Sequence, residues 1–235
     1  MLDRKHRGWK SKTACRSPNK QAVVSKQRSQ STSPQSALVS SVLKLPRAFY
    51  EQKTISVAKQ LLGKYLIRKH PQGDTVGRIV ETEAYIGPQD LACHAAKGRT
   101  ARTEVMFGQA GHAYVYFIYG VYNMLNLVTE KKDYPAAVLI RAVEPVDGVD
   151  LMKSRRRLDK LRGLASGPGK LCQAFAIDRS LNGADLFGDI LYVEDRGEPA
   201  PKFNATRRIG VDYAGKWKDK PYRFLVRNSE YVSKI

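Results

Sequence analysis

Short runs of apolar residues from residue 48 onward predict a fold built mainly from strands. The runs are rich in β-branched and aromatic residues, which favour extended structure. They span residues 64–69, 76–85, 113–119, 124–129, 137–143, 190–194 and 222–227. Helices are fewer, with one predicted to end at Leu62, one over residues 145–157 and one beginning at Pro168. Because the connections are too short for regular parallel crossovers, we expect one α+β domain with a curved, mostly antiparallel sheet flanked by helices.

Residues 1–47 lack this periodicity and are predicted to form a basic, disordered arm ahead of a single domain over residues 48–235. The arm holds 11 of the 41 Lys and Arg residues but only 1 of the 22 Asp and Glu residues. A solvated arm of this kind would have weak affinity for phosphate. Its Arg/Ser-rich, acid-poor composition is also typical of an organelle transit peptide, and its short basic clusters are typical of a nuclear signal.

The charge of the chain favours a polyanionic partner. The formal net charge is +19 and the sequence pI is about 9.9, and residues 48–235 alone retain about +9. Such a field attracts nucleic acid or an anionic membrane surface. The most apolar stretch, residues 113–128, is too short and too polar to span a bilayer, so we expect a soluble protein. Three cysteines without CxxC spacing indicate neither a disulfide framework nor a structural zinc site.

Two carboxylates stand inside the apolar strand RIVETEAY at residues 78–85. Because side chains alternate across a strand, we expect Glu81, Glu83 and Tyr85 on one face, together with Ile79. A glutamate beside an aromatic ring can have its protonation tuned and can act as a general base. The alternative is an edge strand whose carboxylates face solvent.

Downstream residues offer a slot for a flat ligand. His94 follows a predicted turn, and a run of tyrosines comes after it at Tyr114, Tyr116, Tyr119 and Tyr122. Aromatic rings on a basic protein can stack on bases or wedge between them. The alternative for the histidine and the tyrosines is ordinary core packing, since one hydrogen bond satisfies a buried hydroxyl. Asn126 lies in a run of Leu and Val, where a buried amide is costly unless it is used.

Several basic residues could bind an anion. Arg141 is predicted at the end of a buried strand, either as a fixed donor fork or as a residue that extends its charge into solvent. The segment SGPGK at residues 166–170 offers free amides and Lys170 as a phosphate seat, without the spacing of a Walker loop. Arg207 and Arg208 are solvated residues or contacts to a phosphate backbone.

Five motifs in order along the chain are GRIVETEAYIGPQDLACH, AYVYFIYGVYNMLNLV, AAVLIRAVEP, SGPGKLCQAFAI and RRIGVDYAGKW. Together they resemble the alkyladenine, or 3-methyladenine, DNA glycosylase family over about residues 48–233. The resemblance implies a monofunctional enzyme of base excision repair that needs neither a metal nor an organic cofactor. Its substrates would be alkylated or deaminated purines of the 3-methyladenine, 7-methylguanine and hypoxanthine class, flipped out of double-stranded DNA. We expect a monomer that acts wherever the DNA is: the nucleus, a bacterial cytoplasm or an organelle.

The resemblance also implies roles for individual residues. Glu83 would activate a water molecule that Arg141 and the backbone carbonyl of Ile209 hold. The flipped base would stack among Tyr85, Tyr116 and His94. Tyr119 would fill the gap in the duplex, and Asn126 would exclude the exocyclic amino group of guanine. Lys170, Arg207 and Arg208 would contact the DNA backbone.

Two other classes of protein fit parts of the pattern. A non-catalytic nucleic-acid binding module would explain the charge and the tyrosines, but a carboxylate in an anion-binding groove costs affinity and has no role there. A nucleoside hydrolase acting on free small molecules would explain the carboxylate and the aromatic slot, but not the excess of basic charge.

Overall fold

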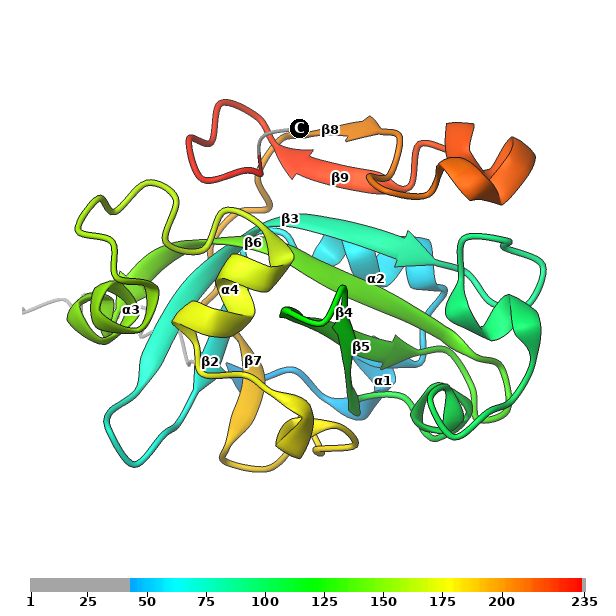
Figure 1. Cartoon of the computed structure of the whole chain (residues 1–235), viewed down its shortest axis with the longest axis horizontal. Coiled ribbons are helices and arrows are strands. Elements are labelled where there is room, and N and C mark those ends of the chain that lie inside the picture. Colours follow the sequence, from blue (N-terminus) through cyan, green and yellow to red (C-terminus); the bar gives the residue numbers. More distant parts are fainter. Residues whose placement is uncertain (1–42, 234–235) are drawn as a thin grey trace, which may run out of the picture. The chain divides into compact units, whose positions relative to one another are not determined.

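One curved sheet organises residues 43–233, the part of the chain that the computed structural model describes (Figure 1). Within this part the nine strands are β1 (Leu43–Lys44), β2 (Tyr65–Arg68), β3 (Thr75–Tyr85), β4 (Ala113–Ile118), β5 (Tyr122–Thr129), β6 (Ala136–Asp147), β7 (Leu191–Asp195), β8 (Phe203–Thr206) and β9 (Arg223–Val226). The strand order is β1-β7-β2-β3-β6-β5-β4, with β9 pairing both β3 and β8, and these pairings are antiparallel. The predicted α+β class and the curved antiparallel sheet are therefore confirmed.

The long strand β3 lies at the centre of the sheet. One of its edges pairs with β6 along nearly its whole length. The opposite edge pairs with β2 over residues 75–78 and with β9 over residues 81–83. Both carboxylates of β3 therefore lie where three strands meet, which explains why they are buried and not on a solvent-facing edge.

Helices cover the sheet from both sides. The α-helices are α1 (Arg47–Tyr50), α2 (Thr54–Gln60), α3 (Val149–Arg156) and α4 (Pro168–Ala174). Helix α2 packs on β3 and β6, whereas α4 packs on β5 and β6, and Figure 1 shows the two helices on opposite sides of the sheet. Short 3-10 helices span His94–Lys97, Glu104–Phe107, Arg179–Leu181 and Asp212–Asp219.

Close packing in the core explains Gly77 on β3. Phe175, which is fully buried, lies against this glycine. A Cβ atom at position 77 would come within 2.9 Å of the Phe175 ring and within 2.6 Å of the Val143 side chain. Any larger residue would push the strand away from its neighbours, so glycine is required by space and not by backbone conformation.

Some boundaries differ from the sequence predictions. The helix predicted over residues 145–157 begins only at Val149, because β6 continues through Asp147. Pro145, which has no N–H group, is tolerated inside β6 where the register with β3 shifts. The short strands β1 and β8 were not predicted, since a few residues carry too little alternation to be recognised.

Residues 43–47 of the predicted arm belong to the fold. Strand β1 pairs with β7, and Leu45 is buried, with its N–H donating to Val193 O at 2.9 Å. Arg47 donates from Nη1 to Ala110 O at 2.5 Å. Residues 1–42 lie outside the described residues, and the predicted arm stays a prediction there.

The first prediction compares chains that begin at residue 43 and at residue 48. The shorter chain loses the Leu45 burial and the Arg47 hydrogen bond, so we expect its free energy of unfolding to be lower by about 2–3 kcal/mol. Urea denaturation of both chains measures this difference. Equal midpoints and slopes would show that residues 43–47 contribute nothing to the fold.

Candidate active site

Glu83 is completely buried and is held by three donors. Its Oε1 accepts from the backbone N–H of Ile209 at 2.8 Å. Its Oε2 accepts from the Tyr85 hydroxyl at 2.9 Å and from Arg141 Nη1 at 3.3 Å. Because a carboxylate oxygen can accept at least two hydrogen bonds and Oε1 of Glu83 has one donor, Oε1 retains capacity for a water molecule. The structure therefore brings together Glu83, Tyr85, Arg141 and Ile209, and the group of Ile209 that contacts the carboxylate is its N–H and not the carbonyl named in the prediction.

Two of the three register shifts in the β3–β6 pair lie beside these side chains. The Cα partners run from Ile79 and Val143 to Glu81 and Ala142, which leaves Val80 as an extra residue on β3. The next pair is Thr82 with Ile140, which leaves Arg141 as an extra residue on β6. Bulges bend a strand and redirect its side chains, often beside active sites.

Two expectations from the sequence are wrong here. The first is the face of Ile79, because of the bulge at Val80, and the second is the position of Arg141 at the end of a strand. Ile79 belongs to the main core cluster together with Ala84, and not to the face of Glu83 that strict alternation assigns to it. Arg141 lies inside β6 and is only 7% exposed, so it does not extend its charge into solvent from a strand end. Its alternative role as a fixed donor fork is the one its hydrogen bonds support.

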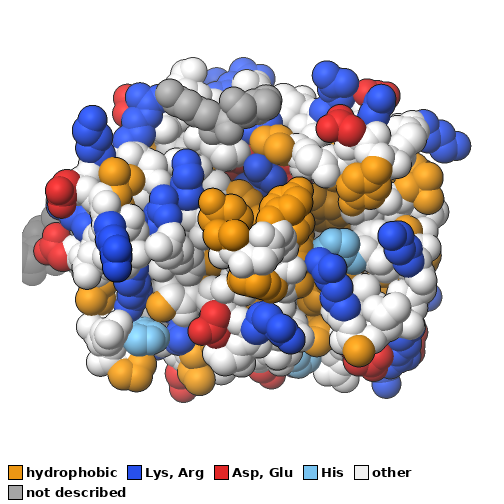
Figure 2. Space-filling model, in the orientation of Figure 1, with side chains coloured by type: hydrophobic (Ala, Val, Ile, Leu, Met, Phe, Trp, Pro, Cys, Tyr) orange, Lys and Arg blue, Asp and Glu red, His pale blue; other side chains and the backbone are white. Residues whose placement is uncertain are grey.

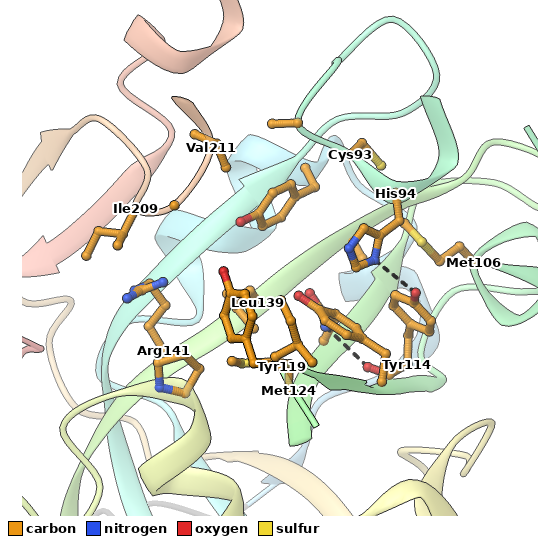
Figure 3. A pocket seen from close by; sticks show the side chains of 18 of the residues that line it. Cys93, His94, Met106, Tyr114, Tyr119, Met124, Leu139, Arg141, Ile209 and Val211 are labelled. Atoms are coloured by element: carbon orange, nitrogen blue, oxygen red, sulfur yellow. Dashed lines mark hydrogen bonds between the residues drawn. The ribbon is translucent and has the colours of Figure 1, made fainter. Parts of the chain in front are cut away.

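A cleft of about 250 Å³ lies beside the residues that hold the Glu83 carboxylate. Tyr85, Arg141 and Ile209, the three partners of Glu83, all line it, so the carboxylate lies just behind the wall. Figure 3 shows Arg141 and Ile209 on one side of this cleft and His94 with Tyr114 on the other. The arrangement places a buried carboxylate, a guanidinium and aromatic rings around one small space.

Aromatic rings form the wall opposite Arg141. The His94 ring stands edge-on to Tyr116, with ring centroids 4.4 Å apart, and its Nδ1 lies 3.0 Å from the Tyr114 hydroxyl. Burial raises the pKa of Tyr114 to about 12. Burial, together with the nearby Arg102 and Lys97, lowers the pKa of His94 to about 4. The wall is therefore uncharged at neutral pH, which suits a flat and even a cationic ligand.

The second prediction concerns His94 and pH. In the unfolded chain its pKa would be near 6.5, so the unfolded state binds the proton more readily than the folded state between pH 6.5 and 4. Stability should therefore fall as pH decreases through this window, by about 2 kcal/mol once partial exposure is discounted. Urea denaturation at several pH values tests this against His94→Gln, which should flatten the profile. Coincident profiles for the two proteins would contradict it.

The hairpin between β4 and β5 supplies Asn126 and Tyr119. Asn126 is buried in the cleft wall, where its Nδ2 donates to Tyr114 O at 3.3 Å. Tyr119 lines the cleft from the hairpin tip with 78% of its surface exposed. Its φ of +54° is unfavourable for a residue with a Cβ, and such strain is often held at functional sites. The ring is thus presented outward beside the cleft.

The predicted backbone contacts separate into exposed and buried residues. Lys170 is exposed at α4, and Arg207 is exposed and paired with Asp219 at 3.1 Å. Arg208 is a correction, because its side chain has no exposed surface and pairs with Asp90 at 2.5 and 2.8 Å. A guanidinium fully enclosed in this way cannot reach a phosphate, so Arg208 is a structural residue.

Sequence reasoning missed the partners of this site that come from distant segments. Asp90 was not singled out, and neither were Arg223 and Ser233, which both contact Glu81. One signal was present: two carboxylates inside an apolar strand need buried cations, and arginines in two other strands, Arg141 and Arg223, could supply them.

Residues 43–233 contain no group of three or more His, Cys, Asp or Glu side chains that could hold a metal ion. In the same part of the chain, none of the helices has the length and apolarity needed to cross a bilayer.

Comparisons with known proteins find one family model and relatives with one name. The family model for methylpurine-DNA glycosylase matches residues 48–230. Similar proteins named "Putative 3-methyladenine DNA glycosylase" come from Methanocella arvoryzae, Myxococcus xanthus and Legionella pneumophila. Their identities over 192 residues are 60%, 50% and 46%. These matches cover 81% of this chain and 96%, 93% and 98% of the relatives.

Proposed function

Because the chain belongs to the methylpurine-DNA glycosylase family, we propose that it releases alkylated or deaminated purines from duplex DNA by hydrolysis of the N-glycosidic bond. One observation carries the proposal: the Glu83 carboxylate lies behind a cleft of aromatic rings, with hydrogen-bonding capacity left on one oxygen. The substrates would be of the 3-methyladenine, 7-methylguanine and hypoxanthine class.

The cleft would receive a purine that has left the base stack. Extracting a base costs a few kcal/mol, and damaged or mispaired bases cost less because they stack and pair less well. Tyr85, Tyr116 and His94 would sandwich the purine, and the exposed Tyr119 would occupy the space it vacates. An uncharged aromatic wall suits alkylated purines, many of which are cations.

The hydrolysis step uses water as the nucleophile. Arg141 and the carbonyl of Ile209 would hold the water, and Glu83 would take its proton as the water oxygen bonds to the anomeric carbon of the sugar. The glycosidic bond breaks in the same step, and its electron pair leaves with the purine. A carboxylate close to the sugar also stabilises the oxocarbenium character of the transition state.

The lining of the cleft favours a monofunctional enzyme. A lyase needs an amine that forms a Schiff base with the sugar, and no lysine is among the described residues that line the cleft. Asn126 would add selectivity against guanine, because the exocyclic amino group would clash with its fixed amide. 7-Methylguanine carries the same amino group and would be released despite this contact, because the alkylated base is a cation and a better leaving group.

The basic surface fits a duplex ligand. Figure 2 shows hydrophobic side chains gathered at the centre of this face, with Lys and Arg side chains on both sides of them. Phosphates on the two sides of an extruded nucleotide could meet these cations, whereas a free nucleoside would leave them unused.

The direct test is an excision assay with EDTA present throughout. Duplex oligonucleotides would each carry one hypoxanthine, 7-methylguanine or 3-methyladenine, and a matched undamaged duplex is the control. We expect release of the free base and an intact abasic site. Release from free nucleosides alone, or binding without release, would overturn the proposal in favour of a nucleoside hydrolase or a binding module.

The affinity for DNA is expected to depend on the salt concentration. Each phosphate contact releases counterions, so the affinity for damaged duplex should fall steeply with ionic strength, and Lys170→Gln should reduce the slope of log K against log[salt] by about 1. Fluorescence anisotropy from low to physiological salt measures this slope. Lys69→Gln is the control, because Lys69 lies just after β2 and its charge is already paired with Asp74. A slope unaffected by Lys170→Gln would remove this residue from the interface.

A further inference from the structure

Arg141 is held by a buried group of charged and polar side chains. This group consists of Glu81, Arg223 and Ser233, and we call it the clamp. We propose that the clamp is a positioning device for base release and that the C-terminal segment, through Ser233, completes the active site. The proposal rests on the proposed function and assigns residues that do not themselves touch the substrate.

Glu81 is the centre of the clamp and is completely buried. Its Oε1 accepts from Arg141 Nε at 3.0 Å, from Arg223 Nε at 2.7 Å and from the Ser233 hydroxyl at 2.8 Å. Its Oε2 accepts from the backbone N–H of Ser233 at 2.6 Å. A buried carboxylate is tolerated only when it is paired and hydrogen-bonded, and four donors meet this requirement.

The clamp leaves Arg141 one orientation. Its Nε donates to Glu81, its Nη1 to Glu83 at 3.3 Å and its Nη2 to the Ser233 hydroxyl at 3.4 Å. All three nitrogens of a planar, rigid guanidinium are therefore engaged, two of them by the clamp. Arg141 also lines the cleft, so its orientation decides where a bound water can lie relative to Glu83.

Glu81 also balances the charge of Arg141. Glu81 and Glu83 are both within ion-pair distance of this one guanidinium. If Glu81 lost its charge, Glu83 would be the remaining anion beside Arg141, and the guanidinium would shift onto it. The shift would displace Arg141 from the water and engage the oxygen atoms that must accept the proton.

Ser233 ties this arrangement to the end of the chain. It contacts Glu81 through two of its atoms, and its carbonyl accepts from Arg223 Nη2 at 3.3 Å. It is 7% exposed, although it lies near the C-terminus. The residues that the family model matches end at 230, so this contact lies outside the matched region.

The test compares Glu81→Gln and Ser233→Ala with the parent protein in single-turnover excision of hypoxanthine and in binding of the same duplex. We expect Glu81→Gln to slow base release by about 10- to 100-fold, since small misplacements of reacting groups have effects of this size. Ser233→Ala should slow it by a smaller factor. Both should keep the dissociation constant for damaged duplex within about threefold, because the clamp does not line the cleft.

The matched control is Thr82→Val, on the same strand. Thr82 is fully buried and donates to Ala58 O at 2.8 Å, away from the clamp. We expect Thr82→Val to lower thermal stability and leave the rate of release unchanged. A slower release by Glu81→Gln or Ser233→Ala would then not be explained by lost stability. If Glu81→Gln and Ser233→Ala release the base at the parental rate, or if only binding weakens, the clamp is wrong. If the parent protein itself releases no base, the proposed function fails first, and the clamp fails with it.

Discussion

Replacing Glu83 by Gln should abolish nearly all base release while leaving binding to damaged duplex intact. The amide keeps the size of the carboxylate but cannot take a proton from water, and positioned general bases contribute about 10²- to 10⁴-fold. The substitution also removes the negative charge that stabilises a cationic sugar, so we expect the loss to lie at the upper end of this range. Single-turnover excision and anisotropy on the same duplex measure the two quantities separately.

A suitable control for this variant is Glu104→Gln. Glu104 is an exposed carboxylate that forms an ion pair with Arg99 at 2.5 Å. Like Glu83 it is a glutamate paired with an arginine, but it lies on the surface and does not line the cleft. It should retain the parental rate. If Glu83→Gln also excised hypoxanthine at that rate, the carboxylate would not be the base and the proposed mechanism would be wrong.

The largest expected effect on stability comes from Asp90→Asn. Asp90 and Arg208 form a pair with no exposed side-chain surface, so removing the negative charge leaves a buried guanidinium without its counterion. Breaking such a pair costs about 3–5 kcal/mol. For a domain of this size we expect the melting temperature to fall by about 6–20 °C. Differential scanning calorimetry measures the change directly.

Asp219→Asn provides the comparison, because Asp219 pairs with the neighbouring Arg207 on the surface. That pair is exposed on both sides, and exposed pairs contribute about 1 kcal/mol or less. Asp90→Asn should therefore be several times more destabilising than Asp219→Asn. Equal effects would mean that the buried pair adds nothing beyond an ordinary surface contact and would contradict the prediction.

The adjacent residues Arg207 and Arg208 could not be distinguished from the sequence near them. Both were predicted to contact the DNA backbone, since a pair of arginines in a basic protein is usually exposed. Only the fold separates them: Arg208 turns inward to Asp90 and donates to Ala84 O, whereas Arg207 faces solvent. The buried position also fixes the next residue, Ile209, whose N–H reaches Glu83.

The sequence predicted more of strand β3, which carries Glu83. Alternation alone placed Glu83 and Tyr85 on one face, and their side chains are hydrogen-bonded at 2.9 Å. Alternation failed at Ile79, because the bulge at Val80 inserts one residue and reverses the assignment before it. A bulge depends on the partner strand, so its position cannot be read from β3 alone.

The amino-acid sequence by itself indicated seven of the nine strands, where the carboxylates and tyrosines lie within them, and that the chain is strongly basic. These properties depend on residues close together in the chain. Tertiary structure alone decided which charges meet. Asp90 reaches Arg208 across 118 residues, and Glu81 reaches Ser233 across 152. The Glu81 contact depends on strand order and on the bulges beside it, whereas Asp90 and Arg208 lie in loops that only the folded chain brings together.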